Sequence, residues 1–165
     1  MNLSNKFCLG TVQFGQKYGF FNKKKLTDIE IKKIIKSINQ KKIKFLDTAL
    51  SYGESQIKVG KFKKKNFKIV SKLIFDKDLK LIDKDFEKLL KQLKSNNIYA
   101  LLVHNPDVLL TKKSKLIFNY LNGLKKKKLI RKFGVSVYDP TTLNKILKKF
   151  KIDIIQFPGN VLDKR

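Results

Sequence analysis

Short apolar runs alternate with helical patterns along this chain. Each run is rich in β-branched or aromatic residues and has the length of a buried parallel strand. The runs cover residues 7–12, 44–47, 66–72, 98–104, 132–136 and 152–157. We expect a strand at each of these positions.

The stretches between the runs have the apolar spacing of amphipathic helices. Apolar residues recur three and four positions apart, which gives each helix one apolar stripe. The stripes are Ile31, Ile34, Ile35 and Ile38; Phe86, Leu89, Leu90 and Leu93; Leu116, Ile117, Tyr120, Leu121 and Leu124; and Leu143, Ile146, Leu147 and Phe150. Thr27 and Glu30 have the spacing of a capping box, and Asp139-Pro140 is typical of a helix start.

This alternation predicts an α/β fold with a parallel sheet covered by helices. Two architectures compete, an open doubly wound sheet and a closed barrel. Neither a G-x-G-x-x-G turn nor a P-loop follows the first predicted strand, which disfavours the open sheet. We therefore expect a parallel (β/α)8 TIM-barrel type. We expect it to be incomplete, with about six strands of eight. A whole barrel needs about 250 residues, and this chain has 165. We expect one domain, 1–165.

Lysine dominates the composition and gives a formal net charge of +26, while Arg occurs only at Arg131 and Arg165. So much positive charge raises the alternative of a basic nucleic-acid-binding domain. The lysines are spread over the whole chain, however, and no nucleic-acid-binding motif is present. We expect a solvated lysine surface with weak, sequence-indifferent binding to nucleic acid at low salt, and no specific nucleic-acid partner.

Polar and titratable residues stand at the ends of successive predicted strands. They are Asp47, Lys72, His104, Ser136 and Gln156, and Tyr52 follows Asp47 in the next loop. The carboxyl ends of the strands in a parallel barrel meet on one face, where active sites are built. One such residue alone is commonly a helix cap or a surface charge. The ordered set predicts a site in which these side chains meet.

Several segments around these residues resemble the aldo-keto reductase family. They are Leu9-Gly-Thr-Val-Gln-Phe-Gly15, Phe45-Leu-Asp-Thr-Ala-Leu-Ser-Tyr-Gly53, Ile69-Val-Ser-Lys72, Leu102-Val-His-Asn-Pro106, Phe133-Gly-Val-Ser136 and Ile155-Gln-Phe-Pro-Gly-Asn160. The resemblance implies hydride transfer between NADPH, or NADH, and an aldehyde or ketone, or the reverse with an alcohol or sugar. It assigns the catalytic positions to Asp47, Tyr52, Lys72 and His104, and implies that Ser136 and Gln156 bind the nicotinamide carboxamide.

The chemistry of carbonyl reduction fits these residue types. Negative charge develops on the carbonyl oxygen, which needs a proton donor and hydrogen bonds. We expect Tyr52 to donate the proton and Lys72 to lower the Tyr52 pKa, which is ordinarily near 10. Asp47 would hold Lys72, and a neutral His104 would orient the carbonyl. No metal site is expected, because one His and one nearby Asp are too few ligands.

The chain also departs from the family pattern. Two strands of a barrel are missing, and Val137 stands where the family often has an Asn that binds the carboxamide. A catalytically inactive, truncated remnant is therefore the main alternative to an active reductase. The open edges predict self-association or a complementing partner. The sequence has neither a signal peptide nor an apolar run long enough to span a membrane, so we expect a cytoplasmic protein without membrane contacts. Cys8 is expected to be a buried hydrophobe.

Overall fold

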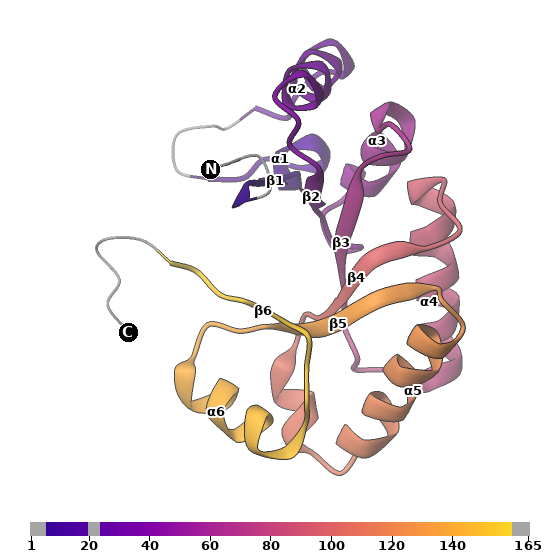
Figure 1. Cartoon of the computed structure of the whole chain (residues 1–165), viewed down its shortest axis with the longest axis vertical. Coiled ribbons are helices and arrows are strands. Elements are labelled where there is room, and N and C mark those ends of the chain that lie inside the picture. The colour runs from indigo at the N-terminus through magenta and orange to yellow at the C-terminus, as the bar shows by residue number, and fades with distance from the viewer. Residues whose placement is uncertain (1–5, 20–23, 160–165) are drawn as a thin grey trace.

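The computed structural model describes residues 6–19 and 24–159. Six parallel strands form one curled sheet in the order β1-β2-β3-β4-β5-β6, so each strand pairs with its neighbours in sequence (Figure 1). The strands are β1 (Cys8–Gly10), β2 (Phe45–Asp47), β3 (Lys68–Leu73), β4 (Ile98–Val103), β5 (Ile130–Ser136) and β6 (Ile154–Gln156). The predicted α/β fold class is confirmed: the sheet is a half-barrel, consistent with an incomplete (β/α)8 barrel.

Helices connect the strands and cover the outer, convex side of the sheet, as Figure 1 shows. They are α1 (Val12–Gly15), α2 (Asp28–Gln40), α3 (Ser55–Phe62), α4 (Leu79–Leu93), α5 (Ser114–Lys126) and α6 (Pro140–Lys149), with a 3-10 helix, η2 (Pro106–Leu110), before α5. Thr27 and Glu30 form the predicted capping box of α2. The Asp139 carboxylate accepts hydrogen bonds from two backbone N–H groups at the start of α6.

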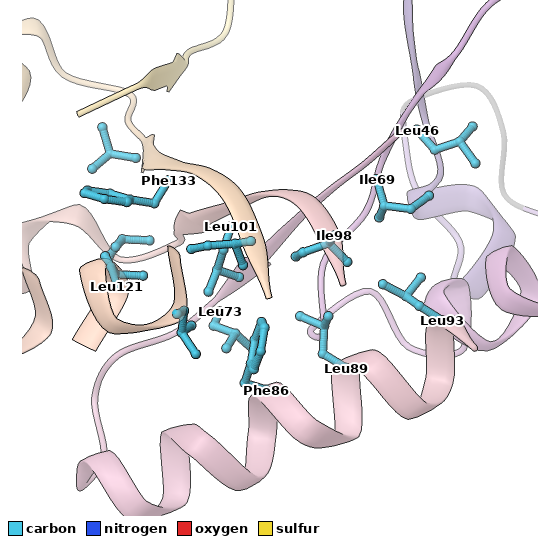
Figure 2. Packing of buried hydrophobic residues seen from close by; sticks show 14 of the residues in the cluster. Leu46, Ile69, Leu73, Phe86, Leu89, Leu93, Ile98, Leu101, Leu121 and Phe133 are labelled. Atoms are coloured by element: carbon cyan, nitrogen blue, oxygen red, sulfur yellow. The ribbon is translucent and has the colours of Figure 1, made fainter. Parts of the chain in front are cut away.

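The core lies between the sheet and these helices. Figure 2 shows Leu46, Ile69, Leu101 and Phe133 of the strands facing Phe86, Leu89, Leu93 and Leu121 of α4 and α5. The apolar stripe of α4 is fully buried except for Leu90, which is partly buried and packs against the core. Full burial of such a side chain stabilises the fold by about 1.5–3 kcal/mol. Two stripe assignments are wrong: Leu116 is 55% exposed and Leu147 is 44% exposed, because each lies at the margin of its helix's buried face.

The first strand is shorter than the sequence pattern predicts. Strand β1 ends at Gly10, and Val12 begins the short helix α1 instead of extending the strand. Cys8 is exposed, which contradicts its prediction as a buried hydrophobe. The reason is geometric, because β1 is an edge strand of an open curl. Its inner face therefore borders a concavity rather than a packed interior.

This concavity lies on the inner side of the half-barrel. It is lined by Cys8, Asp47, Val70, Leu102 and residues 154–157. Among the described residues, β1 pairs only with β2, and β6 only with β5. No helix in the described part of the chain is long and apolar enough to cross a membrane.

Candidate active site

The strand ends deliver four of the six predicted site residues to the concave face of the sheet. Ser136 lies opposite Gln156 in the pairing of β5 with β6. Residues that pair across parallel strands point to the same face, and side chains alternate along each strand. The registers of the intervening strands therefore place Asp47 and Lys72 on the same face as Ser136 and Gln156. Asp47 and Gln156 also line the same concavity.

Asp47 and Lys72 form a buried ion pair at the centre of this face. The Lys72 Nζ atom lies 2.7 Å from Oδ1 and 2.8 Å from Oδ2 of Asp47, and donates to the Thr48 carbonyl oxygen at 3.2 Å. The Lys72 side chain is 2% exposed and that of Asp47 is 14% exposed. A buried ammonium group needs such partners to remain charged. The pair therefore fixes the ammonium and its counter-charge in place beneath the loop that follows β2.

Tyr52 lies in this loop, above the ion pair. The Lys72 Nζ atom is 5.0 Å from the centroid of the Tyr52 ring. The His104 ring lies 6.0 Å from the same ring, centroid to centroid, in an edge arrangement at 79°. The phenol, ammonium, carboxylate and imidazole groups that the sequence predicts to meet are therefore gathered in one place.

The Tyr52 pKa differs from the prediction. We expected Lys72 to lower it, but burial, with a contribution from the Asp47 carboxylate, raises the pKa of Tyr52 to about 12. Burial of the phenol is the larger cause; in addition, Asp47 binds Lys72 through both oxygens and compensates its charge. Smaller contributions come from Tyr138 and Tyr18. The phenol is therefore fully protonated at neutral pH, as a proton donor must be.

His104 follows β4 and is half-buried. Burial, together with the nearby Lys72 charge, lowers its pKa below the usual value, so the imidazole is neutral at neutral pH, as expected. Its backbone N–H donates to the Leu73 carbonyl oxygen at 2.8 Å. Its Nδ1 atom lies 3.3 Å from the Ser51 Oγ atom. Sequence reasoning missed Ser51, and its only signal is its position beside Tyr52.

A cluster of buried hydroxyl groups holds the Tyr52 loop from below. Thr11 Oγ1 donates to the Asp47 carbonyl oxygen at 2.8 Å and lies 2.8 Å from Ser55 Oγ. Ser55 Oγ also lies 3.1 Å from Thr48 Oγ1. All three hydroxyl residues are completely buried. They tie β1, the end of β2 and the start of α3 together, and so set the height of the loop between them.

Two glycines of the family-like segments allow this loop to pack closely. A Cβ atom on Gly15 would lie 1.9 Å from the Tyr52 carbonyl oxygen. Gly53 has a φ of +56°, in the left-handed region that favours glycine, and a Cβ there would be 2.9 Å from the Gly15 carbonyl oxygen. Only glycine fits both positions without displacing the backbone. These residues therefore act on the site through the position of Tyr52.

Ser136 and Gln156 lie side by side at the ends of β5 and β6. Ser136 is 9% exposed. The Gln156 Oε1 atom is buried and accepts no hydrogen bond within the described part of the chain. A buried oxygen of this kind is costly unless a donor satisfies it. Val137 is buried in the core and does not join the site. Asn160, the last residue of the matching segment, lies outside the described residues.

Comparisons with known proteins bear on the family and the fold. The sequence profile described as the Aldo/keto reductase family matches residues 6–165. The chain belongs to the aldo-keto reductase family. No match is found among curated proteins.

Residues 6–19 and 24–159 contain no group of three or more His, Cys, Asp or Glu side chains arranged to hold a metal ion.

Solved structures of aldo-keto reductases share the fold. A crystal structure assigned to this class from Pseudomonas aeruginosa matches with a TM-score of 0.80 and 26% identity, covering 94% of this chain and 64% of the other. The holo form of an aldo-keto reductase from Bacillus halodurans matches with a TM-score of 0.78 and 19% identity, over 96% and 55%. A Bombyx mori aldo-keto reductase in complex with NADP matches with a TM-score of 0.69 and 19% identity, over 92% and 53%. This chain thus spans less than two thirds of the length of these relatives.

Proposed function

We propose that this aldo-keto reductase chain carries the proton-transfer half of an NADPH-dependent oxidoreductase site. The reaction is the reduction of an aldehyde or ketone, or the reverse with an alcohol or sugar. One observation carries the proposal: a protonated, half-buried phenol stands over a fixed ammonium and beside a neutral imidazole. Residues 1–165 would contribute this site as a single partial barrel domain.

The roles follow from the charges. Tyr52 donates its proton to the carbonyl oxygen on which negative charge develops. The Lys72 ammonium lies 5.0 Å from the ring centroid and provides a fixed cation beside the phenolate that remains, although Asp47 compensates part of its charge. Asp47 positions Lys72, and neutral His104 donates a hydrogen bond to the same oxygen. If the Ser51 hydroxyl donates to Nδ1 of His104, the ring proton lies on Nε2 and that nitrogen is the donor.

The residues at the ends of β5 and β6 fit a nicotinamide cofactor. Such a cofactor supplies the hydride when it is bound. Its carboxamide is both a donor and an acceptor, and the unsatisfied Gln156 Oε1 needs a donor. Ser136, opposite Gln156 in the sheet, offers a hydroxyl that can donate or accept. We propose NADPH over NADH, in keeping with the Bombyx mori relative, whose structure contains NADP.

Turnover tests this proposal directly. Consumption of NADPH, and separately of NADH, is followed with a panel of aldehydes. Tyr52→Phe removes the proton donor and keeps the ring, so kcat should fall by about 10²–10⁴-fold. Tyr120→Phe is the matched control, because the Tyr120 hydroxyl bonds Asp83 on the outer helices and should leave turnover unchanged. Full turnover in Tyr52→Phe would refute the assigned role.

An inactive remnant is the second candidate, because the buried Val137 side chain after Ser136 can offer no hydrogen bond to a carboxamide. It predicts neither NADPH binding nor turnover. Equilibrium binding of NADPH, measured by its fluorescence, separates the two readings. Binding that weakens in Gln156→Leu supports the reductase site, whereas no binding by the parent chain supports the remnant.

The edges of the sheet also bear on partners. Among the described residues, β1 and β6 each have one side without a strand partner. An unpaired strand edge attracts further strands, and Phe157 beside β6 is 66% exposed. We propose that the chain self-associates or takes a complementing partner at these edges. Light scattering over a range of protein concentrations tests this, and a monomer at every concentration would contradict self-association.

A further inference from the structure

The loops that lead into the strands form a lysine-rich surface that the proposed site does not use. We call the loops 41–44, 63–67, 94–97, 127–129 and 150–153 the lysine rim. Each precedes one of the strands β2 to β6. Because all of these strands are parallel, the loops lie at one end of the half-barrel. Tyr52 and His104 follow their strands and therefore lie at the opposite end.

The two ends differ in their balance of charge, because lysines at the opposite end, such as Lys77, Lys112 and Lys113, stand among carboxylates. The rim contains ten lysines: Lys41, Lys42, Lys44, Lys63, Lys64, Lys65, Lys94, Lys127, Lys128 and Lys151. Its only carboxylate is Asp153, which already binds Lys125 at 2.7 Å. Carboxylates gather instead in the loops that follow strands, at Glu54, Asp76, Asp78, Asp107 and Asp139. Helix carboxyl ends favour nearby lysines, which explains individual positions but leaves the rim as a whole without counter-charges.

Three more cations gather around one aromatic ring beside the rim. Lys68 Nζ and Lys132 Nζ lie 5.4 Å and 5.8 Å from the Tyr99 ring centroid, and the Arg131 guanidinium carbon lies 6.0 Å from it. The Phe45 ring meets Tyr99 edge-on at 5.2 Å. No carboxylate of residues 6–19 and 24–159 forms an ion pair with these three cations. The Tyr99 ring and the Asp153 carboxylate, which interacts with Lys132, offset part of their mutual repulsion. An external anion or screening would relieve more of it.

We propose that the lysine rim and the Tyr99 cluster bind single-stranded nucleic acid without sequence preference. Lysines that meet backbone phosphates release condensed counterions and gain affinity. The half-buried Tyr99 ring lies among the cations, where a base of an unpaired strand can stack. Arg, which reads base edges, occurs in this region only at Arg131, so sequence discrimination is not expected. Nucleic acid is therefore expected to bind at this end of the half-barrel, whereas net charge alone would let it bind anywhere on the surface.

Two matched triple variants test the location. Lys64→Gln, Lys65→Gln and Lys127→Gln remove three exposed charges from the rim. Lys112→Gln, Lys113→Gln and Lys115→Gln remove three exposed charges from the opposite end. With a fluorescent oligothymidylate at low salt, the rim variant should raise Kd by about tenfold or more and flatten the slope of log K against log salt by about 2. The control should change Kd by less than about twofold. Equal losses in both variants, or no binding by the parent chain, would overturn the proposal.

A second comparison tests the single-strand assignment. The parent chain should bind the oligothymidylate more tightly than a DNA duplex of equal length, and more tightly than phosphatidylserine vesicles. Tyr99→Leu should weaken binding to the oligothymidylate by about fivefold or more, as expected when one base loses its stacking partner. Thermal melting followed by circular dichroism checks that this variant is folded. Equal or tighter binding to the duplex or to the vesicles would show that single-stranded nucleic acid is the wrong ligand. If Tyr99→Leu fails to fold, the rim triple variant still tests the location of the binding surface.

Discussion

Replacing Asp47 by Asn should lower the Tyr52 pKa, because it removes the charge that now compensates Lys72. Asn retains an oxygen that can accept a hydrogen bond from the ammonium, so Lys72 keeps a hydrogen-bond partner. In the parent chain the Lys72 Nζ atom is 5.0 Å from the Tyr52 ring centroid but binds both Asp47 oxygens. After the substitution that positive charge acts on the phenol without compensation.

The distance sets the size of the effect. The distance from Lys72 Nζ to the Tyr52 ring centroid, 5.0 Å, stands in for the separation of the two charges. Two unit charges at about that separation interact by about 3 kcal/mol at an effective dielectric constant of about 20, which corresponds to about 2 pKa units. The Tyr52 pKa is about 12 in the parent chain, where the Asp47 carboxylate contributes to raising it. We expect the pKa in the variant to fall to about 10.

Alkaline titration of tyrosinate absorbance measures this change without any turnover. The chain has five tyrosines, so the same titration with Tyr52→Phe in each background isolates the Tyr52 signal. Asp153→Asn, which breaks the pair of Asp153 with Lys125 at the opposite end of the sheet, is the control and should leave the Tyr52 pKa unchanged. A Tyr52 pKa that remains near its parental value in folded Asp47→Asn would refute the reasoning that Lys72 acts on this phenol.

The lower Tyr52 pKa in Asp47→Asn should also change how the reaction rate depends on pH. In the proposed mechanism, carbonyl reduction needs the protonated Tyr52 phenol, so the rate should hold below the Tyr52 pKa and fall as the pH rises through that value. In the parent chain this loss belongs near pH 12. In Asp47→Asn it should move to lower pH. Alcohol oxidation needs the phenolate and should change in the opposite direction, gaining rate as the pH rises.

Three further predictions concern the support of the site. Gly15→Ala should lower the free energy of unfolding in urea by about 1–3 kcal/mol, because the new Cβ would lie 1.9 Å from a backbone oxygen. Gly123→Ala is the control: a Cβ there meets open space within helix α5, so it should raise the free energy of unfolding by about 0.5–1 kcal/mol. Equal effects of the two substitutions would contradict the packing argument. Thr11→Val should cost about 1–3 kcal/mol by leaving buried hydroxyl partners unsatisfied, and an unchanged urea midpoint would show that the hydroxyl cluster contributes nothing. NMR titration of His104, the single histidine, should give a pKa below its usual value of 6.5, and Lys72→Met should raise it, because burial and the Lys72 charge lower it.

Most of the framework was predictable because it depends on local rules. The periods of the apolar residues gave all six strands and the stripes of the long helices, and parallel topology then required the strand ends to share a face. Errors arose where the neighbours of a residue come from distant segments. Cys8 follows a strand pattern, but the burial of an edge strand depends on what lies next to it in space, and the pattern does not contain that information.

The grouping of the candidate site residues was predictable from the sequence, and their electrostatics were less so. The positions of Asp47, Tyr52, Lys72 and His104 follow from the strand ends and from the family resemblance. The direction of the Tyr52 pKa shift does not, because it depends on how completely a carboxylate compensates an ammonium and on how deeply the phenol is buried. Ser51 was missed because a serine in a loop has no distinguishing pattern, and only the fold brings its hydroxyl to the His104 ring.

The strand order of this sheet has a consequence for how the chain is made. Every strand pairs with the strand that precedes it in the sequence, so the partner of each new strand has already left the ribosome when that strand emerges. Helix α4 packs on α3 and β3, both of which are synthesised before it. Structure can thus grow in the direction of translation, one βα unit at a time, and the exposed growing edge at each stage is the docking surface for the unit that follows.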